Sequence, residues 1–343
     1  MKTAKWRSLA LGAFGMLVLV AALSCRDSLT PAPGSAAAAR TNGAVDASMA
    51  LDPGTMEICG PVPATLVITQ NARLVCDVEC GSTTGPCIQF GRDNITLWLN
   101  GFTMRGPAVP PAVGCVPSPG FGPGNPGLHF DGISTAGFDR VRIRGPGMVE
   151  TFRRHGIFVF ESEGVIVERV TAHYNCYSGI LLGLSNNNDI LENVSVRNAS
   201  ASGGFPCGGN CITNSNGNRI WRNHFYGNGS VVPGFPPLAV PNDFGVGLVG
   251  TSSDNVIESN SVGGNISGIF LTPLTARNLI RRNLFAGNPP VQVSVTHGAP
   301  VGVDIRNLSI TGTNVFEENH CITSEGPVAP DPCPNFPPFR GHY

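Results

Sequence analysis

The side chains best suited to chemistry gather in the first half of the chain. His129, Asp131 and His155 bring two imidazoles and a carboxylate into one region. A histidine near an acid can serve as a general acid and base pair, which makes these three the candidate catalytic residues. The competing interpretation is that polar residues here solubilise the flank of an exposed sheet. The same region also holds Arg153, Arg154, Glu161, His173 and Tyr174.

Apolar rings lie beside this polar group. Phe158 and Phe160 alternate along one expected strand and therefore point to the same side, with Leu181 on the next repeat. The three are candidate ligand-binding residues that can form a stacking platform for sugar rings. The alternative is a surface that an insertion covers.

Several kinds of chemistry are disfavoured. Both lysines, Lys2 and Lys5, lie in the first 25 residues, so the remainder has no lysine for a Schiff base or a general base. Cys207 and Cys211 have no second Cys/His pair at zinc-like spacing, and we expect no metal and no cofactor. Without its first 25 residues the chain has 22 − 3 = 19 basic against 23 acidic residues. This balance and the lack of a basic patch argue against nucleic acid as a partner.

The composition predicts an all-β protein. Only 13% of the 343 residues are charged, whereas 44 are Gly and 29 are Pro. Gly and Pro are poor inside helices, and short apolar segments between turn residues are typical of strands. With 41% hydrophobic residues the chain can bury a sizeable core, and we expect a monomer with one large domain.

The N-terminus has the order of an export signal. Lys2, Lys5 and Arg7 precede an apolar run, followed by Ala22-Leu23-Ser24-Cys25. The last four residues resemble the lipobox of bacterial lipoproteins, although Ala22 stands where Leu is usual. We predict a lipoprotein signal over residues 1–25, lipidation at Cys25 and anchoring in the bacterial cell envelope. Plain secretion after cleavage and an uncleaved helix are the alternatives. A flexible tether is expected over 26–55 and a Pro-rich cap over 326–343.

The cysteine count fits an oxidising compartment. Eleven Cys less Cys25 leave ten, enough for five disulfides. Short loops favour four pairs, and the fifth follows from the two cysteines left over. The predicted pairs are Cys59 with Cys76, Cys80 with Cys87, Cys207 with Cys211, Cys321 with Cys333, and Cys115 with Cys176.

An internal repeat is the most informative feature. Four segments, NDILENVSVRN, NRIWRNHFYGN, NVIESNSVGGN and NLIRRNLFAGN, begin at Asn188, Asn218, Asn255 and Asn278 and carry Asn at every fifth position. Each follows a short apolar strand, and Gly156 to Gly179 is a 23-residue interval. Asn tolerates left-handed bends, and stacked amides can hydrogen-bond as a ladder. We therefore expect Asn193, Asn223, Asn260 and Asn283 at equivalent bends of successive coils.

These repeats resemble the right-handed parallel β-helix family, which includes pectin lyases and polygalacturonases. The resemblance implies a single solenoid of eight to ten coils over residues 56–325, with loop insertions. It says little about activity, because the scaffold carries lyases, hydrolases, epimerases and noncatalytic proteins. The polygalacturonase and epimerase motifs have no match here. Whether the chain is an enzyme stays open, and if it is, a carbohydrate-active one is expected.

Strand alternation and insertions locate the candidate face. We expect one column to point inward and the neighbouring column outward, which would bring Asp131 close to Phe160. The inward column is Leu128, Ile157, Ile180, Ile212, Val246, Ile269 and Val291, and the outward column is His129, Phe158, Leu181, Thr213, Gly247, Phe270 and Gln292. Insertions at 107–127, 200–210 and 229–243 precede these strands. The leading hypothesis is an exported protein that binds or processes a polysaccharide at this face, and the alternative is a noncatalytic structural or adhesive surface protein.

Overall fold

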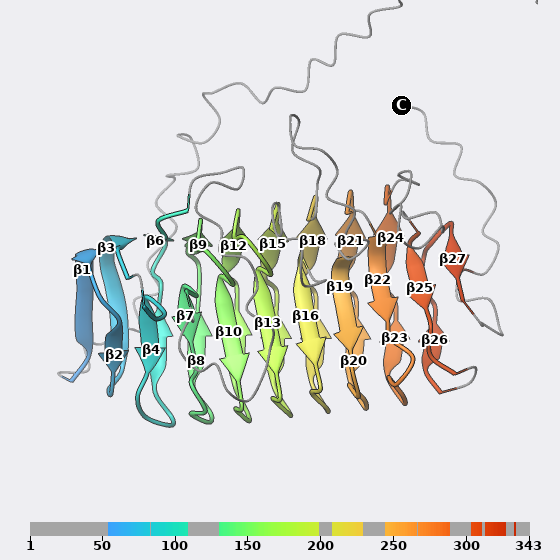
Figure 1. Ribbon diagram of the computed structural model, residues 1–343, viewed down its shortest axis with the longest axis horizontal. Coiled ribbons are helices and arrows are strands. Elements are labelled where there is room, and N and C mark those ends of the chain that lie inside the picture. Colours follow the sequence, from blue (N-terminus) through green and yellow to red (C-terminus); the bar gives the residue numbers. More distant parts are fainter. Residues whose placement is uncertain are drawn as a thin grey trace, which may run out of the picture. The chain divides into compact units, whose positions relative to one another are not determined.

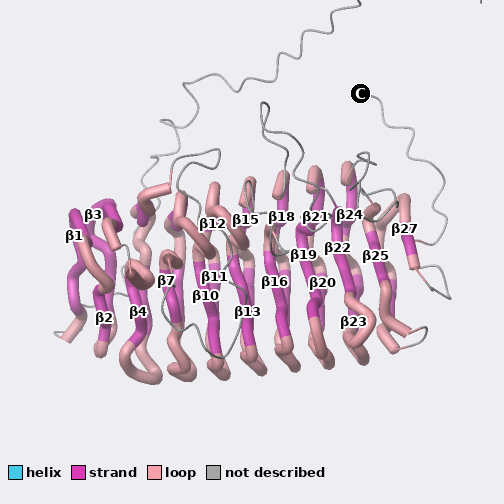
Figure 2. Tube along the Cα trace, in the orientation of Figure 1, coloured by secondary structure: helices cyan, strands magenta, loops and turns pink. Residues whose placement is uncertain are grey.

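Stacked coils of short parallel strands form the part of the chain that the structure describes (Figure 1). This computed structural model describes residues 54–82, 84–108, 130–198, 208–228, 244–265, 267–288, 303–310, 313–326 and Cys333. Within these ranges every regular element is a β-strand, as Figure 2 shows. They contain no helix of the length and apolar character that a bilayer crossing requires.

The first strand of each coil joins a ten-stranded parallel sheet. Its members are β2 (Leu66–Ile68), β4 (Ile88–Phe90), β7 (Ile133–Ser134), β10 (Ile157–Phe160), β13 (Ile180–Gly183), β16 (Asn210–Thr213), β19 (Phe244–Val249), β22 (Ser267–Leu271), β25 (Ile305–Asn307) and β27 (Ser324–Glu325). The predicted all-β parallel β-helix is confirmed, and ten such strands match the upper end of the predicted coil number.

The second and third strands form a 17-stranded sheet. The second strands are β5 (Thr96–Trp98), β8 (Arg142–Arg144), β11 (Ile166–Glu168), β14 (Asp189–Leu191), β17 (Arg219–Trp221), β20 (Val256–Glu258), β23 (Leu279–Arg281) and β26 (Val315–Glu317). The third strands are β6 (Thr103–Arg105), β9 (Met148–Glu150), β12 (Thr171–His173), β15 (Val194–Val196), β18 (His224–Tyr226), β21 (Ser261–Gly263) and β24 (Leu284–Ala286). The longer β1 (Met56–Val62) and β3 (Ala72–Cys80) complete this sheet.

The interior holds one apolar core along the stack. Ile157, Ile180, Ile212, Val246 and Ile269 are fully buried in it, as expected of the inward column. Each such side chain contributes about 1.5–3 kcal/mol on burial. Leu128 and Val291, also expected to point inward, lie outside the described residues.

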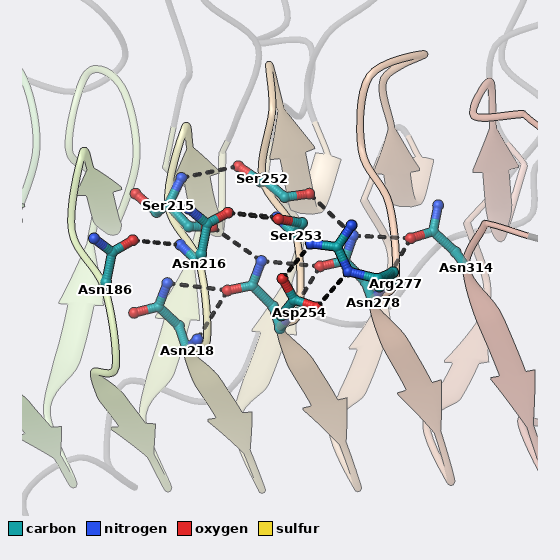
Figure 3. Close-up of polar contacts among 11 residues, drawn as sticks. Asn186, Ser215, Asn216, Asn218, Ser252, Ser253, Asp254, Arg277, Asn278 and Asn314 are labelled. Carbon is teal, nitrogen blue, oxygen red and sulfur yellow. Dashed lines mark hydrogen bonds and ion pairs between the residues drawn. The ribbon is translucent and has the colours of Figure 1, made fainter.

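Three asparagine ladders run along the bends. In the middle ladder Asn193 donates its side-chain amide to Asn223 (3.0 Å), Asn223 to Asn260 (3.0 Å), and Asn260 to Asn283 (2.9 Å). The predicted equivalence of these four residues is confirmed. Figure 3 shows a parallel ladder that runs from Asn218 to Asn314. Because each amide satisfies buried backbone groups as well, the ladders remove unpaired polar atoms from the interior.

The left-handed bends are not made by the ladder asparagines, and this corrects the expectation. The residue before most of them has a positive φ, for example Glu192 (56°), Arg222 (53°) and Arg282 (53°). The asparagines are buried, so they turn inward to form the ladder, and the exposed residue in front makes the bend. The asparagine spacing predicted the position of each bend correctly, but the left-handed conformation belongs to the residue before the asparagine and not to the asparagine itself.

The strand register differs from the expectation at two coils. Ile212 pairs with Leu182 and Leu248, whereas Asn210 stands opposite Ile180 and Val246. The outward residue of this coil is therefore Cys211 instead of Thr213. The expected register aligned apolar residues, and it failed here because a polar residue takes an inward position.

The second register error concerns the early coils. Ile133, not Leu128, pairs with Ile157, so Asp131 comes level with His155 and not close to Phe160. The expected proximity of Asp131 to Phe160 is wrong. The insertion before this strand hides the true Gly132-Ile133 start from a reading that relies on a constant interval.

Disulfides lie at both ends of the described solenoid. Cys59 pairs with Cys76, Cys80 with Cys87, and Cys321 with Cys333, as predicted. Cys176 and Cys211 are also disulfide-bonded, while Cys115 and Cys207, their predicted partners, lie outside the described residues, as does Cys25. Structural disulfides persist in oxidising compartments and fit an exported protein.

Candidate functional site

The candidate site lies where the chain enters the first strands β7, β10 and β13. A Gly-Ile pair stands at the start of each of these strands, and one residue precedes that pair. In successive coils these preceding residues lie level with one another, and they are Asp131, His155 and Ser178. Gly132 donates its N–H to the His155 carbonyl (2.9 Å), and Gly156 donates to the Ser178 carbonyl (3.1 Å). One position earlier, Tyr177 donates its N–H to the Arg154 carbonyl (2.9 Å). We call Asp131, Arg154, His155, Tyr177 and Phe158 the edge cluster.

Close packing of the next turn holds this edge in place. A Cβ on Gly179 would collide with Ser195 Oγ, so the coil needs glycine at this position. Asn175 accepts the Phe152 N–H (3.1 Å) and donates to the Val149 carbonyl (3.1 Å). Asn175 also donates to Asn198 (2.9 Å), which joins the edge cluster to an asparagine ladder. The cluster is therefore built on rigid backbone.

A buried ion pair occupies the centre of the edge cluster. Arg154 Nη1 lies 3.8 Å from Asp131 Oδ2, with side-chain exposures of 9% and 0%. Asp131 Oδ1 also accepts the backbone N–H of His155 (3.1 Å). Burying two charges is costly unless they are paired and hydrogen-bonded, so this arrangement is expensive compared with an apolar one.

His155 is enclosed by rings and has a defined tautomer. Its Nδ1 accepts the Ser178 N–H (3.3 Å), which places the ring proton of the neutral imidazole on Nε2. The ring centroid lies 5.5 Å from that of Phe158 and 5.7 Å from that of Tyr177. In this arrangement His155 is suited to donate a hydrogen bond, and action as a base through Nδ1 would require loss of the Ser178 contact.

The outward face of β10, β13 and β16 carries a second apolar cluster. Phe158 and Leu181 are each 1% exposed and pack with fully buried Cys211. Phe160 is partly exposed, and its ring centroid lies 5.1 Å from that of Phe158. The Arg154 guanidinium lies 5.4 Å from the Phe158 ring centroid. Phe158 and Leu181 are covered, so an open stacking platform at these two side chains is not what the structure presents.

The other expected members are dispersed. His129 lies outside the described residues. Arg153 lies over the Phe130 ring at 5.8 Å, and Glu161 is exposed at a bend. His173 and Tyr174 belong to β12 and the bend after it, on the other sheet. Tyr177 and Ser178 were not among the predicted residues, although aligning the Gly156-Ile157 and Gly179-Ile180 pairs places them level with Arg154 and His155.

The described residues bring no three His, Cys, Asp or Glu side chains together in a way that can hold a metal ion.

A row of charged side chains lies on the third strands and β3, outside the edge cluster. Arg105 bridges Glu79 (2.7 Å) and Glu150 (2.8 Å), and His173 Nδ1 lies 3.5 Å from Glu150. The His173 imidazole and then Arg105 hold the pKa of the Glu150 carboxyl below its usual value.

Comparison with known proteins concerns the fold. No curated protein matches the chain. Among solved structures it is similar to a variant of the periplasmic alginate epimerase AlgG (12% identity, TM-score 0.46, covering 79% of this chain and 73% of that one). It is also similar to tailspike protein 2 of the Escherichia coli O157:H7 bacteriophage CAB120 (10%, 0.39, 78% and 38%) and to pectate lyase Pel9A (12%, 0.29, 79% and 68%).

A family model supplies the assignment. The model of the right-handed β-helix region matches residues 126–322, which include the edge cluster and all four asparagine repeats. This range covers more than half of the 343 residues. The parallel pairing of every described strand agrees with that match. The chain belongs to the right-handed parallel β-helix family.

Proposed function

We propose that the protein binds a polysaccharide on the outward face of the ten-stranded sheet, beside the edge cluster. The observation that carries the proposal is the apolar cluster of Phe158, Leu181 and Cys211 outside the main core, with partly exposed Phe160 at its margin. Phe158, Leu181 and Cys211 are themselves covered, so the cluster reaches solvent through the partly exposed Phe160, and exposed apolar surface marks contact sites on soluble proteins. Sugar rings stack on aromatic faces, and their hydroxyls take hydrogen bonds from polar side chains.

Binding fits the edge cluster better than acid-base catalysis does. The Asp131 carboxylate is engaged by the His155 backbone and lies near Arg154, and His155 Nδ1 is engaged by Ser178. These contacts orient the two side chains and occupy atoms that acid-base catalysis would use. His129, the third residue proposed for catalysis, lies outside the described part. Catalysis by Asp131, His129 and His155 is therefore the secondary form of the proposal.

Export and lipid anchoring through Cys25 complete the proposed role. The order of basic, apolar and small residues before Cys25 supports anchoring, and the disulfides of the solenoid support export. Replacing Cys25 with Ala should move the protein from membranes to the soluble fraction with its fold intact. Membrane fractionation of Cys25→Ala as before would refute the lipid anchor.

A panel of polysaccharides tests the central part. The purified protein is passed over immobilised polysaccharides while unsaturated products and reducing ends are followed in solution. Retention without product formation supports binding, and product formation identifies an enzyme. No retention and no product on any member would favour the structural or adhesive alternative.

Single substitutions then locate the surface. Phe160→Ala should weaken retention on whichever polysaccharide the wild type binds, because Phe160 is the partly exposed ring beside the edge cluster. Leu284→Ala, a half-exposed apolar residue on the 17-stranded sheet, is the matched control. Equal effects of the two substitutions would contradict the proposed face.

A further inference from the structure

The outward face of the third strands holds an exposed aromatic ring away from the edge cluster. Tyr226 on β18 is 61% exposed. On the next coil its neighbours are Gly263 and Gly264, and a Cβ built on Gly264 would lie 3.0 Å from Tyr226 Cε2 and 3.1 Å from Cζ. The ring lies against the backbone of that coil because glycine leaves room for it. The rest of the ring is accessible to solvent.

Two large side chains occupy the neighbouring bend on earlier coils. Tyr174 and Arg197 have φ values of 51° and 53°, where the equivalent residues of later coils are Gly227, Gly264 and Gly287. A bulky residue seldom adopts this conformation, which costs about 1 kcal/mol relative to glycine. Other bends of this solenoid also carry non-glycine residues at positive φ, so the bend accommodates Tyr174 and Arg197, with glycine as the relaxed alternative.

Tyr174 contacts both Arg197 and His173. Arg197 Nη1 donates to Tyr174 Oη (2.7 Å), and its guanidinium lies 5.8 Å from the Tyr174 ring centroid. The His173 and Tyr174 ring centroids are 3.9 Å apart. Consecutive coils are separated by about 4.8 Å, so His173, Tyr174, Arg197 and Tyr226 make a strip parallel to the solenoid axis. We call these four residues the tyrosine strip.

The charge of the tyrosine strip indicates the kind of ligand. Arg197 is exposed, and among the described residues no carboxylate pairs with it. A guanidinium has five donors, and the contact with Tyr174 uses one of them. The remaining donors match a carboxylate in planar, bidentate geometry. Aromatic rings on either side of this cation suit the faces of sugar rings.

We propose that the tyrosine strip binds a segment of an anionic polysaccharide along the solenoid axis, with Arg197 on a carboxylate and Tyr226 against a sugar ring. The strip lies on the 17-stranded sheet, whereas the face proposed above lies on the ten-stranded sheet. The two sites involve different side chains, so either can fail without the other.

Arg197→Gly is the decisive variant, because glycine already occupies the equivalent bend on three later coils. The probes are soluble polygalacturonate and neutral dextran, with affinities measured by titration calorimetry. Loss of a charge-assisted contact should weaken polygalacturonate binding about tenfold. Arg282→Gly removes the same charge from a bend with the same φ of 53° elsewhere on the solenoid, and it should leave the affinity within about twofold.

The ring is tested separately. Tyr226→Ala should weaken polygalacturonate binding about fivefold, while Tyr226→Phe, which keeps the ring, should bind like the wild type. Circular dichroism melts establish that each variant is folded. Failure of the wild type to bind polygalacturonate, or equal losses in Arg197→Gly and Arg282→Gly, would overturn the proposal. Equal binding by dextran and polygalacturonate would overturn the assignment to an anionic ligand.

Discussion

The two sheets of the solenoid share one interior but present different exteriors. The outward face of the ten-stranded sheet carries Phe158, Leu181 and Cys211, and a buried Arg154–Asp131 pair lies at its edge. The outward face of the 17-stranded sheet carries accessible ion pairs instead, such as Arg105 with Glu79 and Glu150 and Arg281 with Glu258. Exposed pairs solubilise a surface at little energetic gain, whereas buried charges and covered rings are costly to remove. The two faces therefore differ in kind: covered rings and a buried ion pair mark the ten-stranded face, whereas accessible ion pairs accompany the exposed Tyr226 on the 17-stranded face.

The largest expected effect contrasts the two kinds of ion pair. Arg154→Met leaves the buried Asp131 carboxylate without its cation and should lower the free energy of unfolding by about 3–5 kcal/mol. Arg105→Met removes an accessible cation and should cost about 1 kcal/mol or less. Chemical denaturation of both variants makes the comparison. Similar losses in the free energy of unfolding would show that the Arg154–Asp131 pair contributes no more to stability than the accessible pairs of Arg105.

The next contrast concerns aromatic rings. Phe158→Ala should lower the free energy of unfolding by about 3 kcal/mol, because the ring is 1% exposed. Tyr226→Ala should change it by about 0.5 kcal/mol or less, because that ring is largely exposed. Thermal melts resolve a difference of this size. A small loss for Phe158→Ala would mean that the apolar cluster on the ten-stranded face is loosely packed.

A stabilising substitution is expected inside the solenoid. Asn210 is fully buried on β16 opposite Ile180 and Val246, and within the described structure neither atom of its amide has a hydrogen-bond partner. Asn210→Val should raise the free energy of unfolding by about 1 kcal/mol, since an unsatisfied amide is replaced by an apolar, β-branched side chain. Thr213→Val, on the same strand, is the control. A destabilised Asn210→Val variant would indicate that the amide has a role beyond packing.

The smallest effect depends on pH. His173 and Arg105 lower the pKa of Glu150, so the stability that this carboxylate contributes is present above its unfolded pKa of about 4.3 and is lost as the pH falls through the lower folded value. The wild type should exceed Glu150→Gln slightly in melting temperature at pH 6, and this difference should vanish well below pH 4. A difference that grows on acidification would contradict this assignment.

Periodicity determined how much of this fold could be predicted. The five-residue asparagine spacing was enough to align Asn193, Asn223, Asn260 and Asn283, because a ladder demands identical side chains at identical bends. Insertions precede β7 and β16, whose registers were predicted wrongly, but an insertion also precedes β19, whose inward Val246 was predicted correctly. At β16 the inward position is also taken by Asn210, which a hydrophobic pattern does not recognise.

The sequence predicted which part of the chain forms the edge cluster, but it did not predict the contacts within the cluster. Asp131, His155 and Phe158 do come together, but the Arg154–Asp131 pair depends on the true start of β7. The burial of Phe158 depends on tertiary packing, and strand alternation distinguishes only inward from outward. An outward residue can still be covered, and Phe158 and Leu181 are, which agrees with the alternative of a covered surface and not with an open platform.

Side-chain footprinting on the polysaccharide-bound protein tests the central claim most directly. Hydroxyl radicals label accessible side chains, and mass spectrometry compares the labelling with and without the polysaccharide that the panel identifies. We predict that Phe160 and Phe270, on the ten-stranded face, are protected, whereas half-exposed Leu284 and Val315 on the 17-stranded sheet are labelled as before. Protection of Leu284 and Val315 with unchanged labelling of Phe160 and Phe270 would contradict the proposed binding face.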